Sequence, residues 1–312
     1  YQYPPRIYNV PEGILKAGKN TVAIRVVTNR GGAFMEEKPY KMILSDRAID
    51  LTGEWKYRIG VESLPIEGGY TSYQDKPTAL YNGMIAPSNN YKIKGVIWYQ
   101  GESNISRAKE YEALFKDLIN DWRIQRNESK LPFIYAQLPE LNRANKYPSE
   151  SGMAKLREAQ RKALSLPYTG MAVTLGLGDW NDIHPQNKKG VGHRLALEAQ
   201  RVAYGDTSIV SRGPQLESFE VKGNNIILTF SSVGSGLYSN QVLNGFSIAG
   251  ADNRYVWAEA AVLNKNTIKV WSNQVQQPVS VRYGWADNPE GANLKNKEGL
   301  PASSFQVELI KK

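Results

Sequence analysis

Short apolar runs alternate with amphipathic segments through the middle of the chain, from about residue 80 to residue 204. In one such segment Tyr111, Phe115 and Ile119 fall on a single stripe at helical spacing. The pattern predicts strands at 94–99, 132–138 and 170–175 and helices near 111–122, 150–164 and 187–204. Strands that alternate with helices imply right-handed crossovers and a parallel sheet covered on both faces. We therefore predict an α/β domain here.

Strand patterns without helices flank this region on both sides. Before it, a strand is predicted at 21–28 and a second β-like run at 42–59, which are too few strands to close a β-domain. We therefore expect part of that domain to lie upstream of residue 1. After residue 212, runs separated by turn residues predict strands at 216–221, 226–230, 245–249, 255–262, 267–271 and 279–283. Such spacing is typical of a β-sandwich of about 100 residues.

The chain thus divides into a partial β-domain (1–60), an α/β domain (61–211) and a C-terminal β-sandwich (212–312). Its 312 residues are 41% hydrophobic, 10% aromatic and 22% charged, as in a folded protein rather than a disordered one. There is no Cys, which excludes disulfides, thiolate metal sites and a cysteine nucleophile.

Charge and hydropathy bear on the partners. The net charge of +9 is scattered and includes no long Lys/Arg run, so we expect no nucleic-acid partner. No stretch approaches about 20 apolar residues, and the first residues lack a signal-peptide pattern, so we expect no membrane partner either.

Two loops are the first places to look for chemistry, because ligands of open parallel sheets bind beyond the carboxyl ends of the strands. The predicted strand 94–99 runs into residues 100–104, Gln-Gly-Glu-Ser-Asn. The strand 170–175 runs into residues 176–185, which contain one of only two His in the chain. Strands parallel within one sheet would bring these loops to the same edge.

His184 and Asp182 form the first candidate pair. An imidazole that titrates near neutrality suits a general base, and a carboxylate can fix its tautomer and stabilise the imidazolium. The alternative is structural: Asp182 would cap the following helix, Pro185 would occupy its first turn, and His184 would be an ordinary loop residue. The second histidine, His193, lies nine residues on, a spacing that matches no zinc pair, and is interpreted as a helix-surface residue.

Residues 100–104 form the second candidate site. Side-chain amides of Gln100 and Asn104 and main-chain N–H groups around Gly101 are the donors that an oxyanion requires. Glu102 could act as an acid or base or brace the loop, and Ser103 is a formal nucleophile candidate that lacks the second Gly of a Gly-x-Ser-x-Gly elbow. The structural alternative is a polar turn that caps the next helix through Ser103 or Ser106.

A third segment, 282–287, is rich in Tyr and Trp and could stack on sugar rings, although aromatic residues of β-domains usually lie in the core.

Several stretches stand out as a set: LYNGMIAP at 80–87, GVIWYQGESN at 95–104, NDIHP at 181–185 with 191–192 and 194–197, and RYGWADNP at 282–289 with 293–294 and 296–303. Together they resemble the sialate O-acetylesterase family, a branch of the SGNH/GDSL hydrolase superfamily. The resemblance covers most of the chain, and its tail is more family-specific than the short hydrolase motifs.

The resemblance implies an SGNH-hydrolase-like parallel sheet with flanking helices, a C-terminal β-sandwich, and residues 1–60 as the remainder of an inserted, jelly-roll-like β-domain. It also implies hydrolysis of an acetyl ester on a sugar, typically the 9-O-acetyl group of sialic acid, through an acyl-serine. His184 then resembles the general base, and Gln100 with the Gly101 backbone resembles the oxyanion segment, near Glu102 and Asn104. No cofactor or metal is implied, and the expected location is periplasmic, secreted or lysosomal.

The sequence departs from the family pattern at two points. The family places its serine nucleophile upstream, in a Gly-Gln-Ser-Asn type of motif that this sequence does not contain. We therefore expect a companion N-terminal segment to carry the serine. The superfamily usually has Asp-x-x-His, but position 181 is Asn, so Asp182 is the candidate orienting acid; the backbone or Asn181 could hold the imidazole instead.

Two further interpretations of the whole chain remain open. It could belong to an esterase of acetylated plant polysaccharide such as xylan, with the same chemistry on a different sugar. It could also be a non-catalytic carbohydrate-binding or scaffold portion derived from the same fold.

Overall fold

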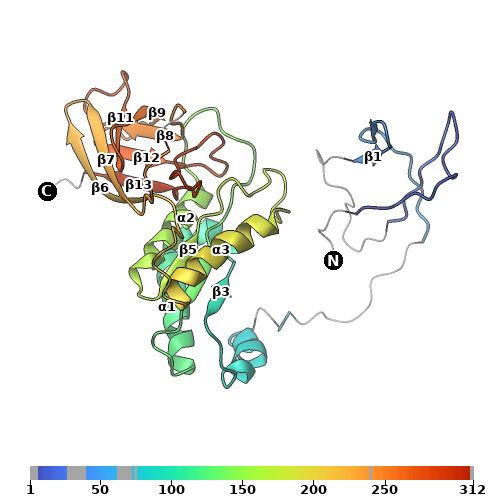
Figure 1. Cartoon of the computed structure of the whole chain (residues 1–312), viewed down its shortest axis with the longest axis horizontal. Helices are drawn as coiled ribbons and strands as arrows, with labels where there is room; N and C mark the ends of the chain where they lie inside the picture. The colour runs from blue at the N-terminus through green and yellow to red at the C-terminus, as the bar shows by residue number, and fades with distance from the viewer. Residues whose placement is uncertain (1–5, 27–39, 62–71, 74–75, 239–240, 310–312) are drawn as a thin grey trace. The chain divides into compact units, whose positions relative to one another are not determined.

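The computed structural model in Figure 1 describes residues 6–26, 40–61, 72–73, 76–238 and 241–309 of the chain. By its internal contacts the chain divides into two units, residues 1–83 and residues 84–312. The predicted domain boundaries near residues 60 and 211 stay predictions.

In the first unit the described strands are β1 (Lys41–Ile43) and β2 (Ala48–Asp50), which pair as an antiparallel hairpin. The strand predicted at 21–28 is wrong over residues 21–26, and its last two residues lie outside the described ranges. Val22, Ile24 and Val26 alternate as expected but are exposed, because no described strand pairs with this segment. Most of the predicted run at 42–59 is likewise not strand.

The second unit contains the predicted parallel sheet. Its strands β3 (Val96–Trp98), β4 (Phe133–Ala136) and β5 (Thr169–Ala172) are parallel and lie in that order, with β4 in the middle. All four residues of β4 are buried, which explains why the strand is a continuous apolar run rather than an alternating one. The α/β prediction is confirmed for this part of the chain, with strands a few residues shorter than expected.

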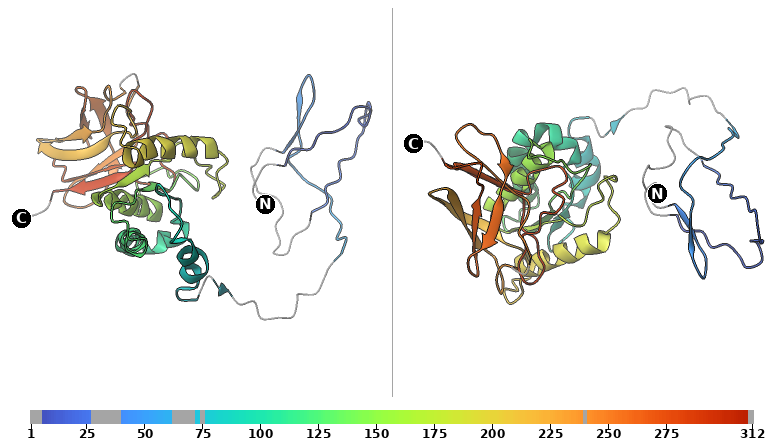
Figure 2. Two further views of the ribbon diagram at one scale, coloured as in Figure 1. Left: turned by 60° about the horizontal axis from the view of Figure 1, so that its bottom comes forward. Right: turned by 90° about the horizontal axis from the view of Figure 1, so that it is seen from above.

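Helices cover both faces of this sheet, as Figure 2 shows. On one face α1 (Ala108–Gln125) and α2 (Gly152–Lys162) pack on Phe133 and Tyr135. On the other face α3 (Lys188–Ala203) packs on Ile134 and Ala136. The shorter helices are η2 (Tyr81–Ile85), η3 (Ala86–Ser88), η4 (Glu102–Arg107) and η5 (Ala163–Ser165).

The two edges of the sheet differ. At β5, side chains of α3 form hydrogen bonds with backbone groups along the edge of the sheet. Arg194 donates to the main-chain oxygen of Val173 at 2.7 Å, and Glu198 accepts from the N–H of Met171. At β3 no described strand or helix plays this part, and Ile97 in the centre of the strand is 64% exposed. Among the described residues, one edge of the sheet is thus covered and the other has no neighbouring strand.

The C-terminal part consists of two antiparallel sheets around one hydrophobic core. One sheet contains β10 (Glu259–Val262), β11 (Thr267–Trp271), β7 (Asn225–Ser231) and β6 (Gln215–Lys222). The other contains β13 (Phe305–Glu308), β12 (Ser280–Tyr283), β8 (Phe246–Ala249) and β9 (Val256–Trp257). The predicted strand 255–262 is in fact two strands that belong to different sheets, and β13 was not predicted. None of the helices among the described residues is both long and apolar enough to cross a membrane.

Candidate active site

The two predicted loops do lie at the same edge of the parallel sheet. The ammonium of Lys188, at the start of α3, is 5.5 Å from the centroid of the Tyr99 ring, which directly follows β3. Burial raises the pKa of Tyr99 to about 12, and the charges of Glu102 and Glu140 add to the shift. Residues that follow β3, β4 and β5 therefore converge here, as the carboxyl ends of parallel strands do.

His184 is exposed, and Asp182 beside it is only 4% exposed. The carboxylate Oδ1 of Asp182 accepts a hydrogen bond of 2.9 Å from the main-chain N–H of His184. The main-chain N–H of Asp182 in turn donates to the oxygen of Asp179 at 3.2 Å. Asp182 therefore fixes the turn that presents His184.

The structural alternative for Asp182 is wrong in its details. The residue that caps α3 is Asn187, whose Oδ1 accepts from the N–H of Gly190 at 3.0 Å. Pro185 precedes the helix instead of occupying its first turn. The second histidine, His193, lies exposed on α3.

Residues 100–104 form a braced loop. The amide Nε2 of Gln100 donates to Oδ1 of Asn104 at 2.7 Å, so the amide of Asn104 directs its Nδ2 group elsewhere. The Tyr111 hydroxyl on α1 donates to the main-chain oxygen of Gln100 at 3.1 Å, and Gln160 on α2 donates to the same oxygen at 3.4 Å. Burial raises the pKa of Tyr111 to about 12, so this donor stays protonated at neutral pH.

Gly101 has a positive φ of 153°, and a Cβ at this position would lie 3.0 Å from Cδ2 of Leu156. Glycine is therefore required by both conformation and space. The capping alternative for this segment is wrong: Gly101 and Arg107 stand at the cap positions of η4 and α1, and neither helix has a side-chain cap. Ser103 is exposed on η4, and Glu102 is half-buried.

Sequence reasoning missed one residue at this edge. Glu140 follows β4, and its carboxylate accepts hydrogen bonds from the main-chain N–H groups of Gly176 and Gly178 at 3.0 and 3.1 Å. A signal was present, because Glu140 comes four residues after the last residue of β4 and so belongs to the third loop of the same edge.

The aromatic segment 282–287 belongs to the core, which rules against its stacking on sugar rings. Tyr283 is 1% exposed and Trp285 is 9% exposed. The main-chain oxygens of Ala286 and Asp287 in this segment accept hydrogen bonds from Arg157 of α2. The segment 282–287 therefore ties the C-terminal part to the α/β part.

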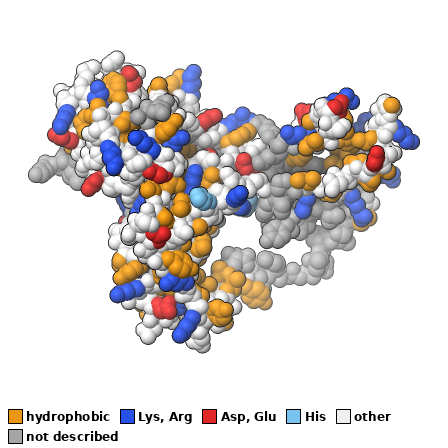
Figure 3. Space-filling view, in the orientation of Figure 1, with side chains coloured by type: hydrophobic (Ala, Val, Ile, Leu, Met, Phe, Trp, Pro, Cys, Tyr) orange, Lys and Arg blue, Asp and Glu red, His pale blue; other side chains and the backbone are white. Residues whose placement is uncertain are grey.

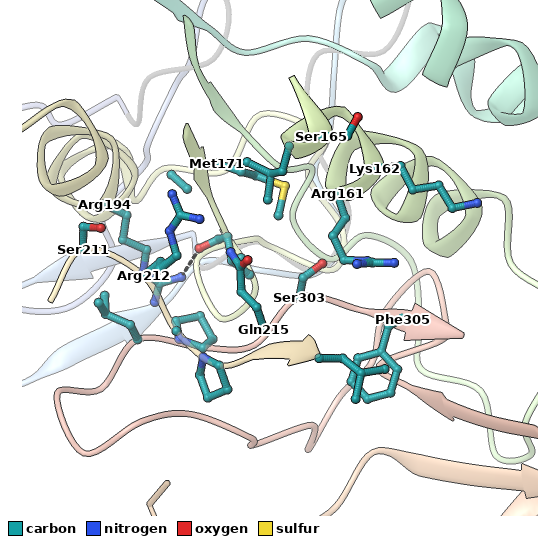
Figure 4. A pocket seen from close by; sticks show the side chains of 18 residues that line it. Arg161, Lys162, Ser165, Met171, Arg194, Ser211, Arg212, Gln215, Ser303 and Phe305 are labelled. Atoms are coloured by element: carbon teal, nitrogen blue, oxygen red, sulfur yellow. Dashed lines mark hydrogen bonds between the residues drawn. The ribbon is translucent and has the colours of Figure 1, made fainter. Parts of the chain in front are cut away.

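A cavity of about 380 Å³ lies away from these loops, between β5, the end of α2 and the C-terminal part (Figure 4). None of the predicted site residues lines it. Arg161 and Arg212 point basic groups toward it, but each forms a bidentate ion pair, with Glu158 and with Glu198. These two arginines are thus engaged in holding the fold together.

Charged side chains of both signs share the surface of the molecule. Lys and Arg side chains are interspersed with Asp and Glu in the view of Figure 3. In the part of the chain that the structure describes, no three His, Asp or Glu side chains cluster closely enough to hold a metal ion.

Comparisons with known proteins agree with one another. A family model for carbohydrate esterases, the sialic acid-specific acetylesterases, matches residues 59–201. Sialate O-acetylesterase of Mus musculus is 31% identical over 258 residues, which cover 74% of this chain and 47% of the mouse protein. The Homo sapiens sialate O-acetylesterase is 30% identical over 239 residues, covering 69% of this chain and 45% of the human protein. The chain spans about half the length of the curated relatives it matches.

A solved structure is similar as well. The crystal structure of a carbohydrate acetylesterase from Xanthomonas citri superposes with a TM-score of 0.71 at 43% sequence identity. The match covers 75% of this chain and 55% of that chain.

Proposed function

This chain belongs to the carbohydrate esterase family of the sialic acid-specific acetylesterases, and from that membership we propose that it supplies the base and the oxyanion site of a carbohydrate O-acetylesterase. The observation that carries the proposal is the convergence of the loop 100–104 and the His184 loop at one sheet edge, where Lys188 meets Tyr99. Neither loop alone would make a site.

In the proposed reaction a serine hydroxyl attacks the acetyl carbonyl while the imidazole of His184 accepts its proton. The tetrahedral intermediate collapses, the bond to the sugar oxygen breaks, and the imidazolium returns the proton to that oxygen. Water activated by the same imidazole then releases acetate from the acyl-serine. Asp182 holds the turn and places a negative charge near the imidazolium.

Stabilisation of the oxyanion is assigned to the braced loop. The Nδ2 group of Asn104 and the main-chain N–H of Gly101 are the proposed donors, and Gln100 fixes the orientation of Asn104. Such donors work best when they are held in place before the charge develops. Hydrogen bonds from Tyr111 on α1 and Gln160 on α2 to the main-chain oxygen of Gln100 hold this loop in place. Glu102 lies at the same edge and is proposed to contact the sugar.

The serine is proposed to come from a companion segment outside these 312 residues, because the sequence contains no Gly-Gln-Ser-Asn motif and Ser103 lies on an exposed short helix. The open edge of β3 supports this proposal. Parallel sheets are normally covered on both faces, and the 64% exposure of Ile97 departs from that rule. A strand added beside β3, together with a helix that follows it on the α3 face, would cover Ile97, and the strand would end at the same edge as His184.

The proposed substrate is an O-acetylated sugar, with acetylated sialic acid first and acetylated xylan as the competing substrate. An extracytoplasmic location belongs to the same proposal and rests on the family resemblance alone.

The test starts from natively purified protein treated with a fluorophosphonate serine probe, followed by mapping of the labelled peptide. Label on a co-purifying upstream peptide supports the proposal, and label on Ser103 overturns the assignment of the nucleophile. Absence of label, with a known serine esterase labelled in parallel, favours a non-catalytic carbohydrate-binding portion.

Acetate release by the complete enzyme, with the serine-bearing segment present, then identifies the substrate and the base. Comparison of acetylated sialic acid with acetylated xylan separates the two substrates. His184→Ala should lower kcat by about 10³-fold or more, whereas His193→Ala, which removes the other, exposed histidine, should leave kcat unchanged.

A further inference from the structure

We infer that Glu140 is the positioning residue of the His184 loop, an inference that rests on the proposed role of His184. Its two carboxylate oxygens bind two different N–H groups of that loop, Oε2 that of Gly176 and Oε1 that of Gly178. A carboxylate shared between two main-chain donors forms charge-assisted bonds that a neutral side chain cannot reproduce. The loop after β4 thus anchors the loop after β5.

Close packing accompanies these bonds. A Cβ on Gly178 would lie 2.6 Å from the main-chain oxygen of Glu140 and 2.9 Å from its Cδ. The two loops therefore touch at Gly178 with no room for a side chain between them. Gly176, four residues after the end of β5, has a positive φ of 81°, which turns the chain toward Glu140.

The anchor is connected to His184 by successive short turns. Asp179 directly follows the anchored Gly178, and its main-chain oxygen accepts a hydrogen bond from the N–H of Asp182. Asp182 then accepts from the N–H of His184. A displacement at Gly178 would pass along these bonded turns to the imidazole.

Glu140 is itself held from the opposite side by the C-terminal part. The N–H of Leu141 donates to the main-chain oxygen of Asp287 at 3.2 Å, and the N–H of Asn142 donates to the oxygen of Trp180 at 2.6 Å. The carboxylate of Asp287 accepts from Ser151 at 2.6 Å. The Glu140 loop is thus bonded both to the tail segment and to the loop that carries His184.

Two variants test this inference in the full chain. Glu140→Ala removes both acceptors, and Glu140→Gln keeps one acceptor oxygen and loses the charge. The matched control is Glu110→Gln, which removes the same charge from an exposed position on α1. Hydrogen exchange should rise across residues 176–184 by about tenfold or more in Glu140→Ala, by less in Glu140→Gln, and not in the control.

The two histidines provide a second readout that is independent of activity. With labelled histidine, the His184 ring resonance should shift or broaden in both Glu140 variants, while that of His193 on α3 should stay in place. A uniform change in both resonances would indicate general destabilisation and overturn the inference, as would unchanged exchange across 176–184.

Acetate release separates this inference from the proposed function. In active enzyme we expect kcat to fall by about 10²-fold with KM within about twofold, because a base displaced by 1 Å loses that much rate. Unchanged kcat in a loosened loop overturns the positioning role and leaves the esterase assignment standing. Parent enzyme that releases no acetate from either sugar contradicts the proposed function, while the exchange and resonance data still decide whether Glu140 holds the loop.

Discussion

The guanidinium of Arg157 on α2 donates a hydrogen bond of 2.7 Å to the main-chain oxygen of Asp287, which lies 130 residues further along the chain. The same side chain donates to the oxygen of Ala286 and to Oγ of Ser304, and none of it is exposed. Burial lowers the pKa of Arg157 to about 10, and the charges of Glu140 and Asp287 oppose that shift. One buried cation therefore joins the α/β part to the C-terminal part.

Arg157→Met should be strongly destabilising. Methionine fills part of the volume but leaves several buried acceptors without a donor, each a cost of about 1 kcal/mol or more. We expect the free energy of unfolding to fall by about 3 kcal/mol in total, measured by chemical denaturation. Arg254→Met, at an exposed position of the C-terminal part, is the control and should change stability little. Equal effects of the two variants would contradict the role of Arg157.

Gly101→Ala should weaken both stability and activity. The new methyl group would press on Leu156 and adopt a positive φ, so we expect a loss of about 1–3 kcal/mol together with a displaced oxyanion loop. Gly192→Ala on α3 is the matched control, because a Cβ there meets nothing within 4 Å. That change should raise stability by about 0.5–1 kcal/mol, since alanine is the better helix residue. Thermal and chemical denaturation should show a loss of stability in Gly101→Ala and a gain in Gly192→Ala.

Asp182→Asn separates the charge of Asp182 from its role in the turn. Asparagine keeps an oxygen that can accept from the His184 N–H, so the turn should persist while the negative charge is lost. We expect kcat to fall by about 10³- to 10⁴-fold if the carboxylate stabilises the imidazolium. A fall below about tenfold in Asp182→Asn, with a larger fall in Asp182→Ala, would show that only the turn matters.

Alkaline titration should detect the half-buried phenol of Tyr99. Its pKa is raised to about 12 from an ordinary 10.0, first by burial and then by Glu102 and Glu140. Because the folded-state pKa lies above the unfolded one, the stabilising contribution is present below pH 10.0 and is lost as the pH rises toward about 12. Phenolate absorbance of Tyr99→Phe should lack one late-titrating group that the parent shows.

The same titration reports on Glu140. Glu140→Gln removes one of the negative charges that raise the pKa of Tyr99, so the phenol that disappears in Tyr99→Phe should titrate at lower pH in this variant. Protein unfolded in urea, where every tyrosine titrates near about 10, is the reference. A Tyr99 titration that is insensitive to Glu140→Gln would contradict the convergence of the three loops.

Local sequence was sufficient for the parallel sheet, its helices and the two loops at its edge. A strand buried on both faces must be apolar throughout, and a helix that covers it must carry an apolar stripe, so both signals lie within a few residues of one another. The prediction that the loops 100–104 and 176–185 lie at the same edge of the sheet followed from strand direction alone. The alternating pattern at 21–26 misled because a strand also needs a partner, and periodicity does not reveal one.

Tertiary structure decided whatever depends on residues far apart in the chain. The apolar run 255–262 reads as one strand, yet it crosses between two sheets at Ala258, because β9 pairs with β8 in one sheet and β10 pairs with β11 in the other. Asp182 binds a neighbouring N–H, but Glu140 reaches across 36 residues to Gly176, and Arg157 reaches across 130 to Asp287. Such contacts depend on how packed elements place two groups in space, and hydrophobic periodicity, which reports only which face of an element is buried, carries no record of them.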